Sequence, residues 1–345
     1  MAAITYKCSN CGGDLKFDPE TQKYRCEYCR AEFTQAELEQ ITPEGEAGEA
    51  GAGEAGAVLY HCPSCGAEIV TDETTVASFC YYCHNPVVLS GKLEGSYHPD
   101  YVIPFAIDKD KALKIFDQWI AGKKYVPKAF YSPSQIEKMS GVYFPYWLYS
   151  CKVDGKLDAE AEKLNTWVTG QVRYTETKKF DVVREGQMPV EHVTRNALKK
   201  ANRQLVEGVL PFDMGKLVPF HMGYLSGFMA ENRDMEQQEF APEVEQEVKE
   251  YAEENLRSQV GPYDSVTVRS QSAELVEPVW NYALMPVWTL TYKEEKTGKI
   301  YYFACNGQTG KICGELPVDT GRLAGLFAAI FIPLSIILLI VGYFI

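Results

Sequence analysis

The sequence is short of cations and of histidine. Its 345 residues contain 34 Lys or Arg against 47 Asp or Glu, a net charge of −13, and only five histidines. Because proteins bind nucleic acid chiefly by neutralising phosphates with cations, this balance argues against DNA or RNA as a partner. It argues equally against attraction to anionic lipid, so membrane attachment must come from an apolar segment.

Familiar catalytic motifs are also missing. No H-E-x-x-H, G-x-S-x-G or G-x-G-x-x-G motif occurs. Residues 307–312 resemble a phosphate-binding loop, but the segment is too short and lacks the Ser or Thr that would hold magnesium. Cys151, Cys305 and Cys313 lie among apolar residues of predicted strands, which predicts buried thiols rather than nucleophiles. We therefore expect no catalytic residues and no enzymatic activity.

What the sequence does contain is a four-cysteine pattern that occurs twice, at an offset of 54 residues. In each copy, 14 residues separate two C-x-x-C pairs, a spacing typical of structural zinc ribbons. A tetrahedral zinc ion takes four thiolates, which leaves no open position for catalysis. We predict two structural zinc ions, with these ligands: Cys8, Cys11, Cys26 and Cys29 in the first set, and Cys62, Cys65, Cys80 and Cys83 in the second.

Two alternatives to eight thiolate ligands remain open. The cysteines could form disulfides, but the first residues lack the apolar core of a signal peptide, so we expect a reducing compartment. His61 and His84 flank ligand cysteines and are alternative ligands, or simply exposed ribbon residues. Gly12 and Gly66 directly follow the second cysteine of a pair, where the chain often takes a positive φ.

The last 23 residues, 323–345, carry no charge. At 1.5 Å per residue, such a helix spans the roughly 30 Å of a bilayer core, so we predict a single transmembrane helix. Since we expect nothing to follow it, the helix is predicted to be a tail anchor. Arg322 and Lys311 place the remainder of the chain in the cytoplasm by the positive-inside rule.

The intervening sequence predicts a multidomain α+β protein with mainly antiparallel strands. We expect strands at residues 101–107, 141–152, 166–174, 179–184, 265–268, 286–292 and 300–305. Helices are predicted at residues 108–121, 194–207 and 242–260, and the last should lie on a sheet through one apolar side. The predicted segments are ribbon 1 at 1–34, a short helix and acidic Gly/Ala/Glu linker at 35–57, ribbon 2 at 58–91, the α+β domain at 97–318, and the anchor at 322–345.

Both ribbons are acidic, and thiolates on zinc add further negative charge, so we expect protein partners. Small modules on flexible linkers would present aromatic residues to such a partner. The aromatics concerned are Tyr28, Tyr81, Tyr82 and Phe33. Equally, these residues could only cover the zinc and form the small core of each ribbon.

Four further blocks, together with the cysteines, resemble bacterial TFIIB-type zinc-ribbon membrane proteins, which are often labelled replication-restart helicases. The blocks are VYFPYWLY at 142–149, VPFHMGYLSGFMAE at 218–231, LMPVWTLTY at 284–292 and FACNGQTGK at 303–311. The resemblance implies zinc at all eight cysteines and no catalytic residues. It also implies membrane adaptors that work with SPFH (flotillin-like) and phage-shock-type proteins in envelope stress. The helicase label finds no nucleotide-binding loop here.

These observations lead us to expect a single-pass, membrane-anchored zinc-ribbon scaffold that recruits proteins to the cytoplasmic face of the cell membrane. One alternative is a nucleic-acid-binding ribbon protein at the membrane. Another is a membrane-bound enzyme of unfamiliar chemistry, which would need a pocket of titratable groups with perturbed pKa values.

Overall fold

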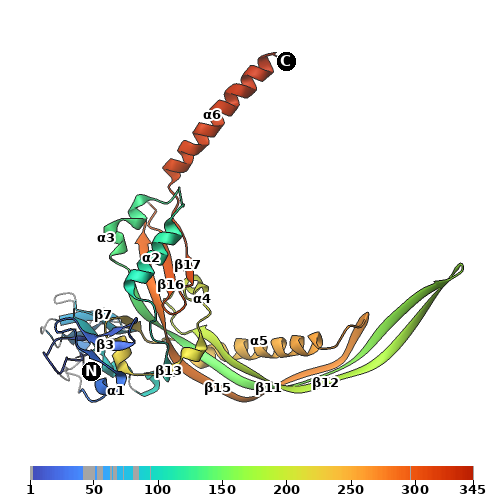
Figure 1. The fold of residues 1–345 in the computed structure, drawn as a ribbon, viewed down its shortest axis with the longest axis horizontal. Helices are drawn as coiled ribbons and strands as arrows, with labels where there is room; N and C mark the ends of the chain where they lie inside the picture. Colours follow the sequence, from blue (N-terminus) through green and yellow to red (C-terminus); the bar gives the residue numbers. More distant parts are fainter. Residues whose placement is uncertain are drawn as a thin grey trace. The chain divides into compact units, whose positions relative to one another are not determined.

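The computed structural model describes residues 3–41, 51–52, 57–62, 64, 68–72, 74–80, 85–93, 95–295 and 297–344 (Figure 1). It is an α+β protein with mainly antiparallel strand pairs, as predicted. The strands are β1 Ala3–Ile4, β2 Leu15–Asp18, β3 Lys23–Cys26, β4 Glu32–Phe33, β5 Gly51–Ala52, β6 Ala57–His61, β7 Glu68–Asp72, β8 Thr75–Phe79, β9 Pro86–Leu89, β10 Tyr101–Val102, β11 Ser140–Thr169, β12 Val172–Asn196, β13 Val218–Pro219, β14 Met229–Glu231, β15 Ser265–Lys293, β16 Ile300–Asn306 and β17 Ile312–Gly314.

Helices are fewer and mostly short. The α-helices are α1 Gln35–Leu38, α2 Lys109–Ile120, α3 Pro133–Ile136, α4 Arg203–Gly208, α5 Gln237–Ser258 and α6 Thr320–Phe344. The 3-10 helices are η1 Ser90–Leu93, η2 Gly95–Tyr97, η3 Lys128–Tyr131, η4 Met214–Lys216 and η5 Met222–Leu225.

The chain forms two compact units that interleave in sequence. Unit 1 is Met1–Phe144, Lys200–Asn232 and Leu284–Ile345, and unit 2 is Pro145–Lys199 and Arg233–Ala283. The long strands β11 and β15 each contribute one end to unit 1 and the other to unit 2. The domain boundaries given above stay predictions.

Unit 1 is built on a mixed sheet with an aromatic core. β14 pairs in parallel with β11 and antiparallel with β8, and β15, β16 and β17 follow one another as antiparallel neighbours. Phe105 stacks on Phe228 at 4.2 Å between ring centroids and meets the edge of Trp288 at 5.2 Å. These three rings are buried and contribute large apolar areas to the core beside this part of the sheet.

Helix α2 covers β16 in unit 1. Asp108 caps its first turn, with the carboxylate accepting from the Lys111 amide at 2.7 Å, and Gly122 follows its end at φ 82°. Phe116 packs edge-on against Phe303 at 5.0 Å. The helix predicted at residues 108–121 is therefore confirmed. The sequence could predict it because its cap, its apolar face and its terminating glycine are all local signals.

Unit 2 is a long antiparallel sheet of β12, β11 and β15 with α5 lying along one face (Figure 1). Val244, Val248 and Ala252 of α5 are buried in a cluster with residues of the sheet. The prediction of an amphipathic helix on a sheet is confirmed. Tyr251 of the same helix is 57% exposed. The sheet partners of this cluster include Tyr149, Cys151, Val153, Met188 and Trp280.

Most element predictions are wrong in extent or type. The predicted strands 265–268 and 286–292 are parts of the single strand β15, and the predicted strands 141–152 and 179–184 are parts of the longer β11 and β12. The helix predicted at 242–260 begins five residues earlier, at Gln237, with Pro242 inside it. The predicted strand 166–174 contains a turn between Thr169 and Val172, so it is the end of a hairpin. The predicted helix 194–207 begins in β12, and α4 starts only at Arg203 after its cap Asn202. The predicted strand 101–107 reduces to β10, whose partner is the equally short β13.

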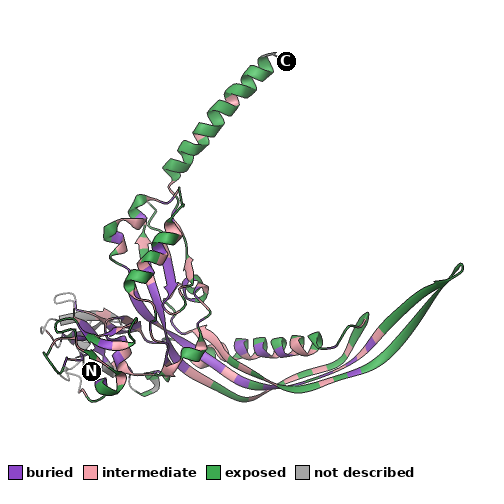
Figure 2. Ribbon diagram, in the orientation of Figure 1, coloured by how far each residue is buried: buried purple, intermediate pink, exposed green. Residues whose placement is uncertain are grey.

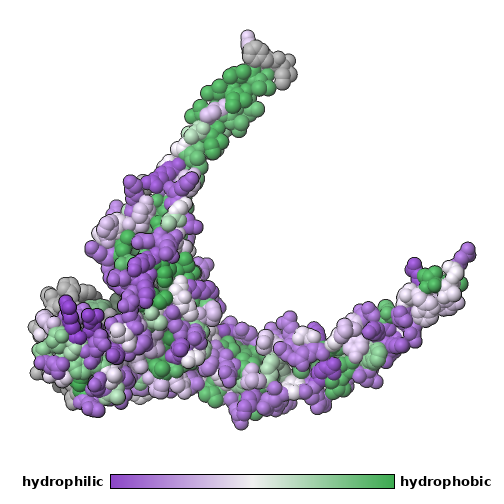
Figure 3. Space-filling model, in the orientation of Figure 1, coloured by the Kyte–Doolittle hydropathy of each residue, from purple (hydrophilic) through white to green (hydrophobic). Residues whose placement is uncertain are grey.

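Helix α6 is long and apolar enough to span a membrane. Residues Thr320–Tyr343 form one uninterrupted apolar helix of 24 residues, and its side chains are not buried by the rest of the protein. Figure 3 shows the hydrophobic surface along it. The predicted start at residue 322 lies within its first turn. Which side of a membrane the chain occupies stays a prediction.

Candidate metal centre

The first set of cysteines forms a compact cluster in the first ribbon. The four sulfur atoms lie within 4.8 Å of one another, and two pairs, Cys8 with Cys29 and Cys11 with Cys26, are 3.5 Å apart. All four are free thiols. A zinc–sulfur bond of 2.3 Å requires sulfurs about 3.8 Å apart at the corners of a tetrahedron. The cluster therefore fits one tetrahedral zinc ion.

Two backbone turns of the same form hold these sulfurs. The Gly12 amide donates to the Cys8 carbonyl at 2.8 Å, and the Arg30 amide donates to the Cys26 carbonyl at 3.0 Å. Gly12 and Arg30 both have positive φ, 74° and 60°. The positive φ predicted at Gly12 is confirmed, and the second turn takes the same conformation without a glycine.

Neighbouring thiols oppose ionisation of Cys29 when no cation is present. A hydrogen bond from the Ala31 backbone lowers the pKa of Cys29, but the neighbouring thiols, first among them that of Cys11, raise it to about 12. A divalent cation removes this opposition by binding the thiolates, so metal binding would release protons.

The first ribbon is docked on the body of unit 1. The Phe17 amide of β2 donates to the Ser226 carbonyl at 3.0 Å, and the Gln22 side chain donates to the Phe105 carbonyl at 2.8 Å. Lys111 of α2 forms an ion pair with Glu20 at 3.0 Å. The expectation of a ribbon that moves on a flexible linker is therefore wrong for ribbon 1, because these contacts bind it to its own chain.

Helix η5 lies beneath this ribbon and fits it closely. Tyr224 packs against Phe17 at 5.2 Å and Tyr24 at 6.3 Å. A Cβ on Gly223 would come within 2.4 Å of Leu38 and 2.9 Å of the Tyr24 hydroxyl. Only glycine lets the backbone approach the ribbon this closely. This segment, part of the block 218–231, thus serves as the base of ribbon 1.

The second set of cysteines is described in part. Cys62 and Cys80 are buried in one cluster with Tyr60, Val87 and Leu89, whereas Cys65, Cys83 and Gly66 lie outside the described residues. The Cys80 amide donates to the carbonyl five residues on, at 2.9 Å, as the Cys26 amide does at 3.0 Å. The half of the second set that is described thus resembles the first. Binding of a second zinc ion stays a prediction.

The strands around the second set also belong to the main sheet of unit 1. β8 pairs with β14 and with β9, and β9 pairs with β1 at the start of the chain. The Asn232 amide, directly after β14, donates to the Thr74 carbonyl, directly before β8, at 2.6 Å. This hydrogen bond adds to the pairing of the two strands. The described part of the predicted second ribbon is thus joined to the body of the unit, and most of the predicted linker lies outside the described residues.

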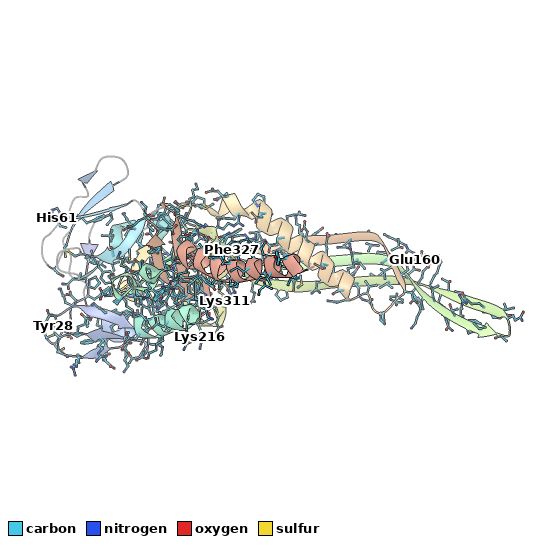
Figure 4. All side chains as sticks on the ribbon, turned by 90° about the horizontal axis from the view of Figure 1, so that it is seen from above. Tyr28, His61, Glu160, Lys216, Lys311 and Phe327 are labelled. Atoms are coloured by element: carbon cyan, nitrogen blue, oxygen red, sulfur yellow. The ribbon has the colours of Figure 1, made fainter. Side chains whose placement is uncertain are left out.

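The aromatic residues of the first ribbon differ in exposure. Tyr28, inside the second C-x-x-C pair, is 83% exposed and lies at the outer edge of the ribbon (Figure 4). Phe33 is half-buried, and His61 is exposed. Tyr81, Tyr82 and His84 lie outside the described residues. Tyr28 is therefore available to a partner and does not serve as core for the metal site.

Lysines of the first ribbon are paired with its carboxylates. Lys7 pairs with Asp14 at 2.6 Å, Lys16 with Glu27 at 2.7 Å, and Lys23 with Glu32 at 3.3 Å. Cations already balanced by carboxylates contribute little to phosphate binding.

Two of the three remaining cysteines are buried. Cys151 and Cys305 are buried, and burial raises the pKa of both thiols, that of Cys305 to about 12. Cys313 is half-buried, and its thiol contacts the Gln204 carbonyl at 3.4 Å. Buried thiols were predicted, and this is confirmed for Cys151 and Cys305.

The chain is similar to a known protein over nearly its whole length. The chain is 30% identical over 343 residues to the uncharacterized protein YdjG of Bacillus subtilis (strain 168), and the match covers 98% of each protein. No protein-family model matches the chain, and no solved structure matches it. Because the alignment covers nearly the whole length of both proteins, the chain belongs to the same family as YdjG.

Proposed function

We propose that this protein is a membrane-anchored zinc-ribbon adaptor that recruits partner proteins to the cytoplasmic face of the cell membrane. The observation that carries the proposal is the first ribbon. A four-thiol cluster fitted for structural zinc is fixed to the body of unit 1 and leaves the large side chain of Tyr28 in solvent. Exposed aromatic residues on rigid supports are favourable anchors for protein interfaces.

Two other features support this role. Helix α6 is long and apolar enough to serve as the membrane anchor. The second cysteine set would hold a second structural zinc ion, since its Cys62 and Cys80 lie together and the Cys80 amide makes the same hydrogen bond, to the carbonyl five residues on, as the Cys26 amide of the first ribbon. The resemblance to TFIIB-type zinc-ribbon membrane proteins adds the partner class, SPFH (flotillin-like) or phage-shock-type proteins.

Charge favours a protein partner over nucleic acid. The ion pairs on the first ribbon leave few cations for phosphate, and the whole chain carries a net charge of −13. A filter-binding assay with duplex DNA should find no affinity that survives moderate salt. Affinity that does survive would favour the nucleic-acid alternative.

The test is affinity purification with crosslinking from native membranes. We compare the wild type with Tyr28→Ser, which removes an exposed side chain without changing a metal ligand. A matched control is Tyr251→Ser on α5, which removes a tyrosine that is 57% exposed in unit 2.

An SPFH-type or phage-shock-type protein should copurify with the wild type and with the Tyr251→Ser control, and be depleted in the Tyr28→Ser sample. Equal recovery with both variants would show that Tyr28 is not the docking residue. Absence of both partner types from all three samples would contradict the adaptor proposal.

A further inference from the structure

The hairpin of β11 and β12 ends in a two-stranded ribbon that the rest of unit 2 does not cover. The third strand of this sheet, β15, reaches only as far as Glu162. It begins at Ser265, and the amide of the preceding Asp264 donates to the Glu162 carbonyl at 2.8 Å. Every residue of β11 after Glu162 is exposed, and so is β12 from Val172 to Asp181 (Figure 2). A bare two-stranded ribbon buries little surface and has little stability of its own.

The end of this ribbon is apolar. Trp167 and Tyr174 face one another across the two strands and stack at 5.7 Å with an interplanar angle of 15°. Trp167 is 45% exposed and Val168 is 62% exposed. The hydrophobic surface at this end is visible in Figure 3. The exposed apolar residues of the tip are Leu164, Trp167, Val168, Val172 and Tyr174.

These side chains occupy both faces of the ribbon. Successive residues of a strand point to opposite faces, so Trp167 and Val168 lie on different sides. The register places Tyr174 on the Trp167 side and Arg173 on the Val168 side. A partner with a flat surface would cover only one of the two faces. A lipid bilayer surrounds whatever enters it and matches an apolar tip on both faces.

The charges of the tip match anionic lipid. Residues 163–178 contain three cations, Lys163, Arg173 and Lys178, against the single carboxylate of Glu176, so the segment carries +2 within a chain of −13. Lys178 pairs with Glu176 at 3.5 Å, whereas Lys163 and Arg173 form no ion pair with any described residue. Screening over about 8 Å at physiological salt limits repulsion from the acidic remainder of the chain.

We propose that residues 163–178, the hairpin tip, form a second membrane contact that inserts Trp167 and its apolar neighbours among the headgroups of an anionic bilayer. Tryptophan and tyrosine favour this interfacial region, and flanking Lys and Arg bind anionic headgroups. The proposal rests on the proposed function only in placing the chain at a membrane. The bilayer is the one that holds α6 or that of an adjacent vesicle.

Tryptophan fluorescence in vesicles tests this directly. The full chain is reconstituted into phosphatidylcholine vesicles with and without phosphatidylglycerol. Both kinds of vesicle contain lipids with brominated acyl chains, which quench tryptophan on contact. The five tryptophans are Trp119, Trp147, Trp167, Trp280 and Trp288, and none lies in α6. Trp167→Phe removes the reporter at the tip, and Trp280→Phe is the matched control, a partly buried tryptophan packed against the core of unit 2.

In anionic vesicles, the wild type and Trp280→Phe should be quenched, and Trp167→Phe should lose most of that quenching. High salt or the double variant Lys163→Gln, Arg173→Gln should weaken the quenching. If the chain floats with the vesicles and Trp167→Phe is quenched like the wild type, the tip proposal alone is overturned. If Trp167 is shielded from acrylamide but not quenched by lipid, the tip is covered by protein instead of lipid, which overturns the proposal. Failure to float would contradict both the anchor and the tip.

Discussion

At the scale of single residues, Gly12 and Arg30 occupy equivalent places in the two turns of the first metal centre. Both adopt positive φ, which costs a residue with a Cβ about 1–2 kcal/mol. Glycine avoids this cost, and the turn at Arg30 retains it, so hydrogen bonding and packing around the cysteines must hold that turn in place. The sequence could predict the first turn from its glycine. The second turn could not be predicted in this way, because Arg30 is not a residue type that favours positive φ.

His221 gives a prediction at the same scale, because it links η5 to the first ribbon. Its Nδ1 accepts from the Gly223 amide at 3.0 Å, and its ring lies 6.1 Å from Tyr6. Burial lowers the pKa of His221, although the charge of Glu39 acts in the opposite direction. The pKa of His221 in the folded protein therefore lies below its unfolded value of about 6.5. The contribution of the neutral ring to the stability of the fold is fully present above about pH 6.5, and it is lost as the pH falls from there through the folded-state pKa.

Thermal unfolding at about pH 7.5 and about pH 6 should show this loss in the wild type. His221→Asn keeps a side-chain acceptor for the Gly223 amide but cannot titrate, so its stability should fall less over the same range. An equal fall in wild type and variant would assign the pH dependence to other groups.

At the scale of elements, local signals decided which predictions succeeded. Helix α2 has an N-cap, an amphipathic face and a terminal glycine within its own sequence, and it was predicted to the residue at both caps. The β11–β12 hairpin has a two-residue connection with Gly170 at φ 63°, set within a run of β-favouring residues. That run was interpreted as one strand because a solvent-exposed ribbon shows no alternation of apolar and polar residues.

Packing of α5 on unit 2 provides a matched pair of glycines. Gly155 and Gly186 face each other across β11 and β12. A Cβ on Gly155 would come within 2.7 Å of Leu256 of α5, whereas nothing lies within 4 Å of one on Gly186. Gly155→Ala should therefore lower the free energy of unfolding by about 1 kcal/mol, since α5 must shift.

Gly186→Ala should leave that free energy unchanged or raise it, because alanine restricts the unfolded chain. Denaturant unfolding followed by circular dichroism compares the two. Equal destabilisation would mean that glycine is needed for strand pairing and not for contact with α5.

At the scale of the whole molecule, the sequence predicted parts but not their attachments. The spacing of Cys8, Cys11, Cys26 and Cys29 was sufficient to predict that they meet, because all four lie within one short hairpin unit. Docking of this ribbon depends on Ser226 and Tyr224, about two hundred residues away in sequence. No local pattern encodes such contacts. The interleaved units follow from the 30-residue strand β11, far longer than the five or six residues of a typical strand.

The central claim is that the cysteine sets hold structural zinc, and metal analysis of the full chain purified without chelator tests it most directly. We predict about two zinc ions per wild-type chain. The double variant that carries Cys8→Ser with Cys11→Ser should hold about one zinc ion, and so should the double variant that carries Cys62→Ser with Cys65→Ser. A wild type without zinc, or a Cys8→Ser, Cys11→Ser variant with undiminished zinc, would contradict the account.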